Sequence, residues 1–179
     1  MQTRGFNGFS YADVAAELGV TKASLHYHYP GKAELGEALI RRYAERFTDA
    51  LGAIDADGGQ ASARLEAYAR LYAEVLRGRR MCLCGMLAAE YQTLPKQIRD
   101  AVIAFFDHNE EWLERVLEQG REEGSLDFDG PAREAARMVV GGLEGAMLVA
   151  RPYGGLERFE AAAARLITSL AGEAAQPAG

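Results

Sequence analysis

Apolar residues in this chain recur every three to four positions, which is the spacing of one face of an α-helix. Residues 32–53 carry a large apolar side chain at every fourth position from Leu35 to Leu51. The strict alternation of apolar and polar residues that indicates a β-strand persists nowhere. The pattern therefore predicts an all-α chain, with helices between Ser10 and Gly19 and over residues 22–28, 32–53, 61–77, 85–93, 95–122, 131–150 and 156–172.

The first two predicted helices are short and have clear start and stop signals. Ser10 can cap the first, with Asp13 three residues later as in a capping box, and Gly19 ends it. Thr21 can cap the second, and Pro30-Gly31 ends it. Two short helices joined by a tight turn that contains glycine form a helix-turn-helix, whose second helix lies in the major groove of DNA.

The second helix would present short polar and cationic side chains near its start. Ala23 and Leu25 are expected on its inward side, while Thr21, Lys22 and Ser24 are expected to be exposed. Such side chains can contact base edges or phosphates. The groups that follow, whose polar tips can also reach phosphate oxygens, are His26, Tyr27, His28 and, at the start of the next helix, Lys32.

The two histidines could also suggest a metal site or a catalytic site. His26 and His28 are two positions apart, so on a helix they point about 200° apart and cannot share a metal ion. No nucleophile or carboxylate pairs with them at helical spacing. We therefore expect no metal site, no catalytic residue and no cofactor, and not an enzyme. It stays open whether Tyr27 and Tyr29 pack in the core while the histidines are merely solvated.

The stretch FSYADVAAELGVTKASLHYHYPGKAEL resembles the DNA-binding segment of the tetracycline-repressor (TetR) family of bacterial regulators. The resemblance covers about 40 residues, from Gly5-Phe6 through Gly19-Val20 to Lys32 and Leu35. It implies a helix-turn-helix head, residues 1–46, and a helical ligand-binding and dimerisation body, residues 47–179. His26 stands where the family most often carries a tyrosine, and a ring nitrogen could replace the phenol on a phosphate. By resemblance, Ser10, Lys22, Tyr27 and Lys32 contact the DNA backbone, and Thr21, Lys22 and Ser24 lie nearest the bases. His26 and His28 complete the predicted set of DNA-binding residues.

The charge distribution permits DNA binding but does not prove it. The whole chain has a net charge of −6, yet residues 1–46 carry +1 and the remainder −7. The acidic body would face away from phosphate. The first helix of the family should precede Gly5, so we expect that the natural chain begins upstream of Met1 and that its head is more positive.

The body should form a homodimer. Helix 131–150 contains Gly141, Gly142 and Gly145, whose helix-destabilising effect suggests that another helix approaches closely. In the family, the last two long helices of each subunit form the dimer interface, although the same residues could instead close the core of one chain. The interface predicted by resemblance consists of Val139, Leu143, Met147, Leu148, Phe159, Ala163, Leu166, Ile167 and Leu170.

A ligand pocket is expected within the body, because aromatic residues and methionine on several helices can line a mainly apolar cavity. Ordinary core packing is the alternative for each of them. The candidates are Tyr68, Tyr72, Met86, Tyr91, Phe105, His108 and Trp112.

Cys82 and Cys84 are the only cysteines. Arg79 and Arg80 precede them near a predicted helix start, which would lower a thiol pKa and favour an electrophile or oxidant sensor. The alternative is two buried cysteines that act as small apolar residues.

These patterns favour a cytoplasmic, homodimeric repressor that a small-molecule effector releases from double-stranded operator DNA. No apolar run long enough to span a membrane and no signal sequence are present, so no membrane partner is expected. The alternatives are a cysteine-based redox or electrophile sensor and a helical adaptor without DNA binding. The operator, the effector and the regulated genes are not readable from the sequence.

Overall fold

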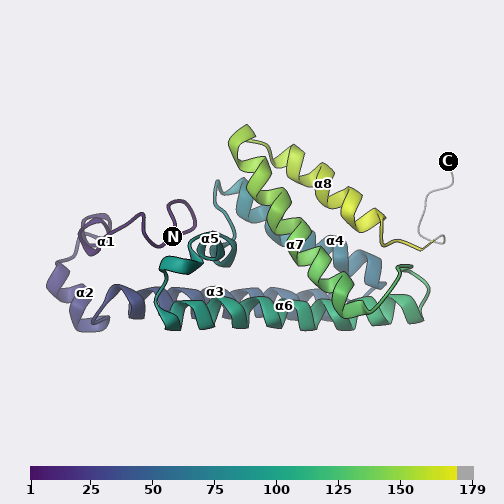
Figure 1. Cartoon of the computed structure of the whole chain (residues 1–179), viewed down its shortest axis with the longest axis horizontal. Helices are drawn as coiled ribbons and strands as arrows, with labels where there is room; N and C mark the ends of the chain where they lie inside the picture. The colour runs from purple at the N-terminus through teal and green to yellow at the C-terminus, as the bar shows by residue number, and fades with distance from the viewer. Residues whose placement is uncertain (173–179) are drawn as a thin grey trace. The chain divides into compact units, whose positions relative to one another are not determined.

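The computed structural model describes residues 1–172. Figure 1 shows that its regular elements are helices, and the described residues contain no strand beyond one isolated bridge between Leu126 and Ala171. The predicted all-α fold is confirmed. The α-helices are α1 (Tyr11–Leu18), α2 (Lys22–His28), α3 (Lys32–Asp57), α4 (Ala61–Arg77), α5 (Leu83–Ala89), α6 (Lys96–Glu122), α7 (Ala132–Ala150) and α8 (Leu156–Thr168), with short 3-10 helices η1 (Tyr91–Thr93) and η2 (Arg151–Tyr153).

Three predicted boundaries are wrong. Helix α3 continues past residue 53 to Asp57, so the connection to α4 shrinks to residues 58–60. The helix predicted over 85–93 is two elements, α5 and η1, and α5 begins earlier, at Leu83. Helix α8 ends at Thr168 instead of residue 172, because the chain then turns to pair with Leu126.

The chain packs as two compact units. Unit 1 consists of residues 1–47 and 82–105, and unit 2 of residues 48–81 together with those from 106 onward. The division into head 1–46 and body 47–179 remains a prediction. The packing differs from that division in one respect, because residues 82–105 belong to the unit that contains α1 and α2.

The core of unit 1 forms where α3, α5 and the start of α6 meet the turn before α1. Gly36 on α3 makes a close approach possible, because a Cβ there would lie 2.8 Å from Ile98 Cδ1 and 2.9 Å from the Phe6 ring. Burying such side chains stabilises the unit by about 1.5–3 kcal/mol each. The buried side chains include Phe6, Ala15, Leu25, Leu35, Ile40, Leu87, Leu94 and Ile98.

In unit 2, α7 and α8 form a hairpin that packs on α4 (Figure 1). Gly142 lets the two helices of the hairpin approach closely, since a Cβ there would lie 2.7 Å from Leu166 Cδ2. The largest side chains buried in this unit are Leu65, Tyr68, Tyr72, Leu113, Leu117, Leu143, Met147 and Phe159.

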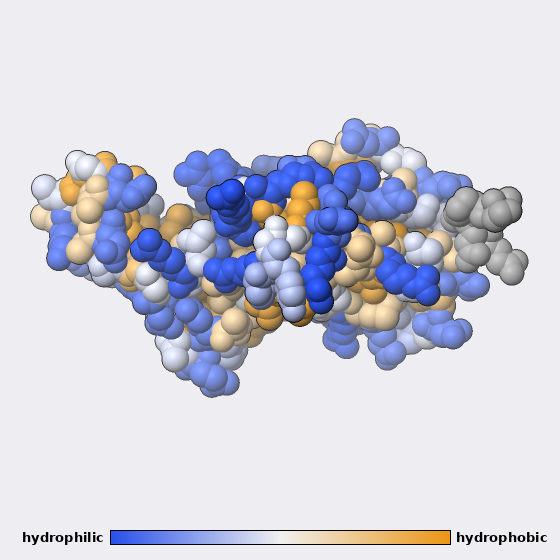
Figure 2. All heavy atoms as spheres, turned by 90° about the horizontal axis from the view of Figure 1, so that it is seen from above, coloured by the Kyte–Doolittle hydropathy of each residue, from blue (hydrophilic) through white to orange (hydrophobic). Residues whose placement is uncertain are grey.

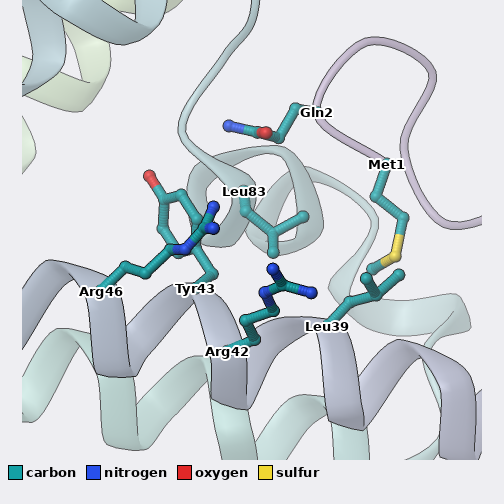
Figure 3. Close-up of a pocket in the computed structure, with 7 residues that line it drawn as sticks. All are labelled: Met1, Gln2, Leu39, Arg42, Tyr43, Arg46 and Leu83. Atoms are coloured by element: carbon teal, nitrogen blue, oxygen red, sulfur yellow. The ribbon is translucent and has the colours of Figure 1, made fainter.

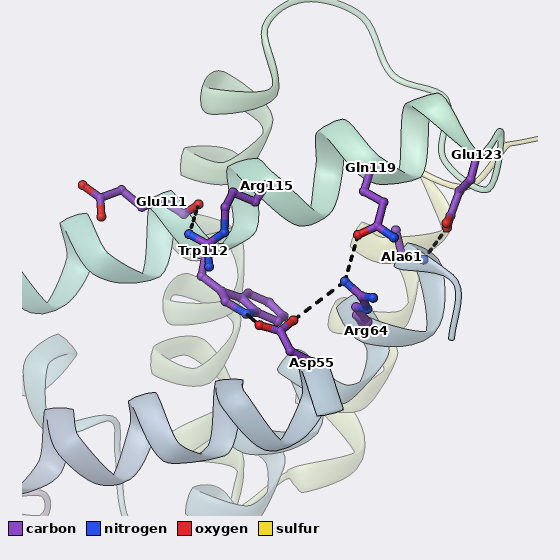
Figure 4. Close-up of polar contacts among 8 residues, drawn as sticks. All are labelled: Asp55, Ala61, Arg64, Glu111, Trp112, Arg115, Gln119 and Glu123. Atoms are coloured by element: carbon purple, nitrogen blue, oxygen red, sulfur yellow. Dashed lines mark hydrogen bonds and ion pairs between the residues drawn. The ribbon is translucent and has the colours of Figure 1, made fainter. Parts of the chain in front are cut away.

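Polar contacts join the end of α3 and the start of α4 to α6 (Figure 4). The indole Nε1 of Trp112 donates to Asp55 at 3.0 Å, and Arg64 lies 3.7 Å from the same carboxylate while it donates to Gln119 at 3.0 Å. The carboxylate of Glu123 accepts from the backbone N–H of Ala61 at 2.6 Å. The contact with Trp112 helps to explain why α3 stays helical beyond residue 53, to Asp57.

Glu123 makes the stability of the protein depend on pH. The hydroxyl of Ser125, and then the N–H of Ala61, hold the pKa of Glu123 below its ordinary value of 4.5. The unfolded chain therefore takes up the proton first, and this contribution is present above about pH 4.5 and is lost as the pH falls through the lowered value.

We expect Glu123→Gln to be less stable than the wild type at pH 7, and the difference to shrink at about pH 3.5. Urea unfolding at both pH values measures it. Glu122→Gln is the matched control, because this exposed neighbour has no hydrogen bond among the described residues, and its stability should follow the wild type. If Glu123→Gln were less stable than the wild type by the same amount at both pH values, Glu123 would not be the source of this pH dependence.

The end of α4 contains an arginine in a conformation that favours glycine. Arg79 has φ 54°, and it is the one non-glycine residue with positive φ in the described chain. The N–H groups of Arg79 and Arg80 donate to Leu76 O at 2.8 Å and Val75 O at 3.1 Å, the Schellman pattern that ends many helices. Glycine normally occupies this position, so Arg79 costs the fold free energy.

Arg79→Gly should accordingly stabilise the protein by about 1 kcal/mol. For a chain of this size, that is an increase in Tm of about 2–4 °C. Differential scanning calorimetry measures it, with Arg77→Gly, inside the helix, as a control that should lower the Tm. A lower Tm for Arg79→Gly would mean that the arginine side chain makes a stabilising contact that exceeds the backbone strain.

The described helices include none that is long and apolar enough to cross a membrane. On the face seen in Figure 2, hydrophilic side chains surround separate apolar areas.

Candidate DNA-binding site

The start of α1 is held by the predicted capping box, which is confirmed. The N–H of Asp13 donates to Ser10 Oγ at 3.3 Å, and the N–H of Ser10 donates to Asp13 Oδ2 at 2.6 Å. The Ser10 hydroxyl also donates to this carboxylate at 2.8 Å. This hydroxyl and the Ser10 N–H lower the pKa of Asp13, so the cap persists well into acid. Ser10 remains exposed beside it.

The turn between α1 and α2 is built by glycine and threonine. Gly19 has φ 66°, and the N–H groups of Gly19 and Val20 close the end of α1 on Ala16 O at 3.3 Å and Ala15 O at 3.0 Å. Thr21 Oγ1 then accepts from the N–H of Ser24 at 3.1 Å and begins α2, as predicted. These local bonds fix the direction of the second helix.

Helix α2 buries one residue, Leu25, and exposes the rest of its length. Ala23 is exposed, so its predicted inward position is wrong. It lies almost opposite Leu25 around the helix, as does Tyr27, which is 85% exposed. The exposed polar groups on this helix and its cap are those of Thr21, Lys22, Ser24, His26, Tyr27 and His28. A small methyl group flanked by such side chains is a surface that can contact thymine methyls, base edges and phosphates.

Two residues near α2 have contacts inside the head. His26 Nδ1 lies 3.1 Å from Pro30 O, and since a carbonyl only accepts, Nδ1 carries the proton of this hydrogen bond. The ring also packs edge-on against Tyr11, 4.6 Å between centroids. Lys32 Nζ donates to Phe9 O at 2.5 Å and lies over the Phe6 and Phe9 rings. Its contact with DNA remains a prediction.

Tyr11 ties the end of α2 to the start of α3. Its hydroxyl lies 2.7 Å from Tyr29 O and 2.6 Å from Gly31 O, both acceptors. Burial, and then the charge of Glu34, raise the pKa of Tyr11, so the hydroxyl keeps its proton. Tyr29 is half-buried at this junction, in agreement with a packing role.

Glu90 connects the segment 82–105 to the turn before α1. Its carboxylate accepts from the N–H of Phe6 at 2.6 Å and of Asn7 at 3.2 Å, and Asn7 Nδ2 donates to Thr93 Oγ1 at 2.7 Å. Gly5 has φ 73°, and a Cβ there would lie 2.2 Å from Glu90 Oε1. No local pattern predicts this contact, because the partners are more than 80 residues apart.

Glu90→Ala should loosen the turn before α1. Hydrogen bonds to a charged group contribute about 1.5–3 kcal/mol, so we expect the amides of Phe6 and Asn7 to exchange with deuterium about tenfold faster or more. Glu90→Gln retains an acceptor oxygen and should recover most of the protection, and Glu37→Ala, exposed in the same unit, should change nothing. Equal exchange in Glu90→Ala and the wild type would contradict a holding role for this carboxylate.

Unit 1 also contains a cavity of about 290 Å³ beside α3 (Figure 3). Arg42 and Arg46 lie one turn apart on α3, and Leu83 and Gln2 face them across the space. Neither arginine forms an ion pair with any described residue, so both add uncompensated positive charge to this unit.

The predicted pocket residues divide between the units. Tyr68, Tyr72 and Trp112 lie together in unit 2, fully buried, with Tyr68 stacked on Trp112 at 5.6 Å. His108 is exposed and contacts Thr48, so it does not join them. Met86, Tyr91 and Phe105 belong to unit 1.

Asn109, which the sequence analysis missed, completes a buried polar cluster. The hydroxyl of Tyr68 donates to Asn109 Oδ1 at 3.1 Å and lies 3.2 Å from the hydroxyl of Tyr72, which therefore donates to it. Asn109 is 1% exposed. An asparagine on the apolar stripe of α6, between Phe105 and Trp112, is the signal that could have revealed it.

Most of the predicted dimer residues are buried within one chain, because α7 and α8 use them to pack on each other and on α4. These are Val139, Leu143, Met147, Phe159, Ala163, Ile167 and Leu170. Leu166 is half-buried against Gly142, and Leu148 is 55% exposed. Of the nine predicted interface residues, only Leu148 and Leu166 therefore keep surface that a second copy could reach.

The exposed side of α7 carries small and apolar residues at helical spacing. Met138 and Leu148 are exposed, and Gly141 and Gly145 lie between them. A Cβ at either glycine would meet nothing within 4 Å. These four residues, Met138, Gly141, Gly145 and Leu148, are called the α7 stripe below.

Cys82 and Cys84 are both reduced and buried, 1% and 0% exposed. Cys82 is the residue before α5, and its side chain does not cap the helix. Their burial favours the interpretation as small apolar residues, because reactive cysteines need access to solvent.

Comparison with known proteins connects this geometry to a family. Residues 1–39 match the family profile described as bacterial regulatory proteins, tetR family, and residues 61–168 match that of the tetracyclin repressor-like C-terminal domain. The chain is 32% identical to the transcriptional regulator AcuR of Cereibacter sphaeroides over 157 residues, which cover 83% of this chain and 69% of AcuR. It is 26% identical to the HTH-type transcriptional repressor DhaR of Mycobacterium sp. over 149 residues, 81% of this chain and 73% of DhaR.

Solved structures agree with the sequence comparison. A TetR-family transcriptional regulator from Agrobacterium tumefaciens superposes with a TM-score of 0.90 at 30% identity, over 93% of this chain and 89% of that one. The reduced form of E. coli NemR superposes with a TM-score of 0.85 at 25% identity, over 97% and 92%. The chain belongs to the tetR family of bacterial regulatory proteins and is a DNA-binding transcriptional regulator.

Proposed function

We propose that this protein is a homodimeric repressor that leaves its operator when a small molecule binds its helical body. The observation that carries the proposal is α2, which buries Leu25 alone and exposes a face of hydrogen-bonding and aromatic side chains. A two-fold dimer would present two such helices to the half-sites of a pseudo-palindromic operator. The name of DhaR, a transcriptional repressor, supports repression as the mode of action.

The α7 stripe supports a dimer. Gly141 and Gly145 weaken the helix, and a Cβ at either position would meet nothing within the same chain. Close packing of a second copy against them would explain why glycine occupies both positions. The stripe lies on the helix pair that the family resemblance assigns to the interface.

The buried cluster of Tyr68, Tyr72 and Asn109 supports a response to a ligand. These hydroxyl and amide groups satisfy one another inside an apolar core. A polar molecule that entered between them would exchange these hydrogen bonds for its own and separate α4 from α6. Such a shift between two packings could change the spacing of the DNA-binding helices.

Fluorescence anisotropy on tiled DNA from the protein's own promoter region, repeated over a series of salt concentrations, tests DNA binding. We expect nanomolar binding to one tile that weakens steeply with salt as counterions are released. Binding to no tile, or equally to all, would contradict sequence-specific repression of its own promoter. The specific tile then serves to screen for molecules that release it.

The cysteine-sensor alternative has its own test on the same tile. A Cys82→Ser, Cys84→Ser double variant should bind this DNA as the wild type does, both with and without an added oxidant, because both thiols are buried. Loss of an oxidant response in the variant would favour the sensor.

A further inference from the structure

A second cavity, of about 370 Å³, lies in unit 2 where the end of α4 meets the turn between α7 and α8. It is separate from the buried tyrosine cluster, none of whose residues lines it. Its volume falls at the small end of the range of about 300–1,000 Å³ that is usual for ligand sites. The cavity could therefore hold one small molecule.

Three arginines line this cavity and no acidic residue does. They are Arg79, Arg80 and Arg151. Arg79 and Arg80 form no ion pair with any described residue, although the chain as a whole has an excess of acidic groups and several other arginines of unit 2 are paired, as Arg77 is with Glu160. The guanidinium groups of Arg79 and Arg80 are therefore available to pair with an anion.

The remaining lining is largely apolar. Leu76, Met81 and Leu156 contribute to it, and Met81 is 4% exposed. A cavity that combines guanidinium groups with aliphatic walls matches a ligand that has an anionic head and an apolar chain. A bare inorganic anion would leave the aliphatic walls in contact with water.

The backbone at Arg79 gives an independent reason to connect this cavity with function. Arg79 adopts φ 54° at a helix end where glycine would be relaxed, and Gly78 precedes it by one position. Residues with a strained backbone conformation are frequent at ligand-binding positions, where a functional role of the side chain outweighs the free-energy cost of the strain. The strained residue is thus one of the three arginines that line the cavity.

We propose that this cavity binds a small carboxylate with a short apolar chain, the carboxylate on the arginines and the chain against Leu76, Met81 and Leu156. The proposal concerns binding to the protein alone and does not depend on whether the ligand releases DNA. Its failure would thus leave the repressor proposal untouched.

Isothermal titration calorimetry of the full chain without DNA tests the proposal. The probes are acetate, butyrate, hexanoate and octanoate, with inorganic phosphate for comparison, all at one ionic strength. We expect affinity to rise about fourfold for each methylene that the cavity covers, and phosphate to bind more weakly than hexanoate. Affinities that are equal along the series, or phosphate binding as tightly as the longest carboxylate, would overturn the proposal.

Variants separate this cavity from binding elsewhere. Arg79→Gly and Arg80→Gln should each weaken hexanoate binding about tenfold or more, and Arg79→Gly should do so in a protein that is more heat-stable than the wild type. Arg115→Gln on α6 removes the same charge outside the cavity and should bind normally. Equal losses in all three variants, or none in the first two, would overturn the assignment of the site.

Discussion

Replacing Gly145 with leucine is expected to weaken the proposed dimer about 30-fold or more while each chain keeps its fold. A Cβ at this position meets nothing within 4 Å, so one chain can accept the larger side chain. Leucine even favours the helix over glycine by up to about 1 kcal/mol. In the proposed dimer, the new side chain would enter the interface from both copies.

Overpacking costs about 1–3 kcal/mol at each site, so the two copies together should weaken the dimer by about 2 kcal/mol or more, which raises its Kd about 30-fold or more. Analytical ultracentrifugation over a range of concentrations measures this. Gly52→Leu is the matched control, because Gly52 is also exposed within a helix, α3, and its Cβ also meets open space. A Gly145→Leu protein that dimerises like the wild type would exclude the α7 stripe as the interface.

Replacing Lys22 with alanine should weaken operator binding about a hundredfold or more. Lys22 is exposed at the first position of α2, where its ammonium group can contact a phosphate. A hydrogen bond to a charged group contributes about 1.5–3 kcal/mol, and a dimer loses two of them.

The salt dependence identifies the kind of contact. Each lost phosphate contact lowers the slope of log K against log salt by about 0.9, so the dimer should lose about 1.8. Lys96→Ala removes the same charge from an exposed lysine of unit 1 that pairs with Asp100, and it should change neither affinity nor slope. A lower affinity with an unchanged slope would place Lys22 away from the phosphates.

The Lys22 and Gly145 variants test different units of the chain. Lys22 acts in the unit that contains α2, whereas Gly145 acts in the unit that contains α7. Loss of DNA binding with normal dimerisation for Lys22→Ala, and loss of both for Gly145→Leu, would show that dimerisation is needed for affinity.

The helix-turn-helix could be predicted in detail because its boundaries depend on neighbouring residues. The capping box of Ser10 and Asp13, the left-handed Gly19 and the cap of Thr21 are interactions over three or four residues, so the local sequence contains both partners. The buried side of α2 is harder to predict, because a short helix has few positions that define its apolar face. Leu25 is buried as expected, but Ala23, expected on the same side, is exposed.

Which distant residues meet becomes clear only in the folded chain. Glu90 holds the turn of Phe6 across 84 residues, and Trp112 keeps the end of α3 helical through Asp55. On α7, apolar periodicity marks Val139 and Leu143 as a buried face, but it does not say whether that face packs on the same chain or on a second one. The residue pattern alone was enough to predict the helices, the DNA-binding motif and the family. The elements against which these helices pack could be identified only from the fold, because contacts between distant residues depend on where the whole backbone places them.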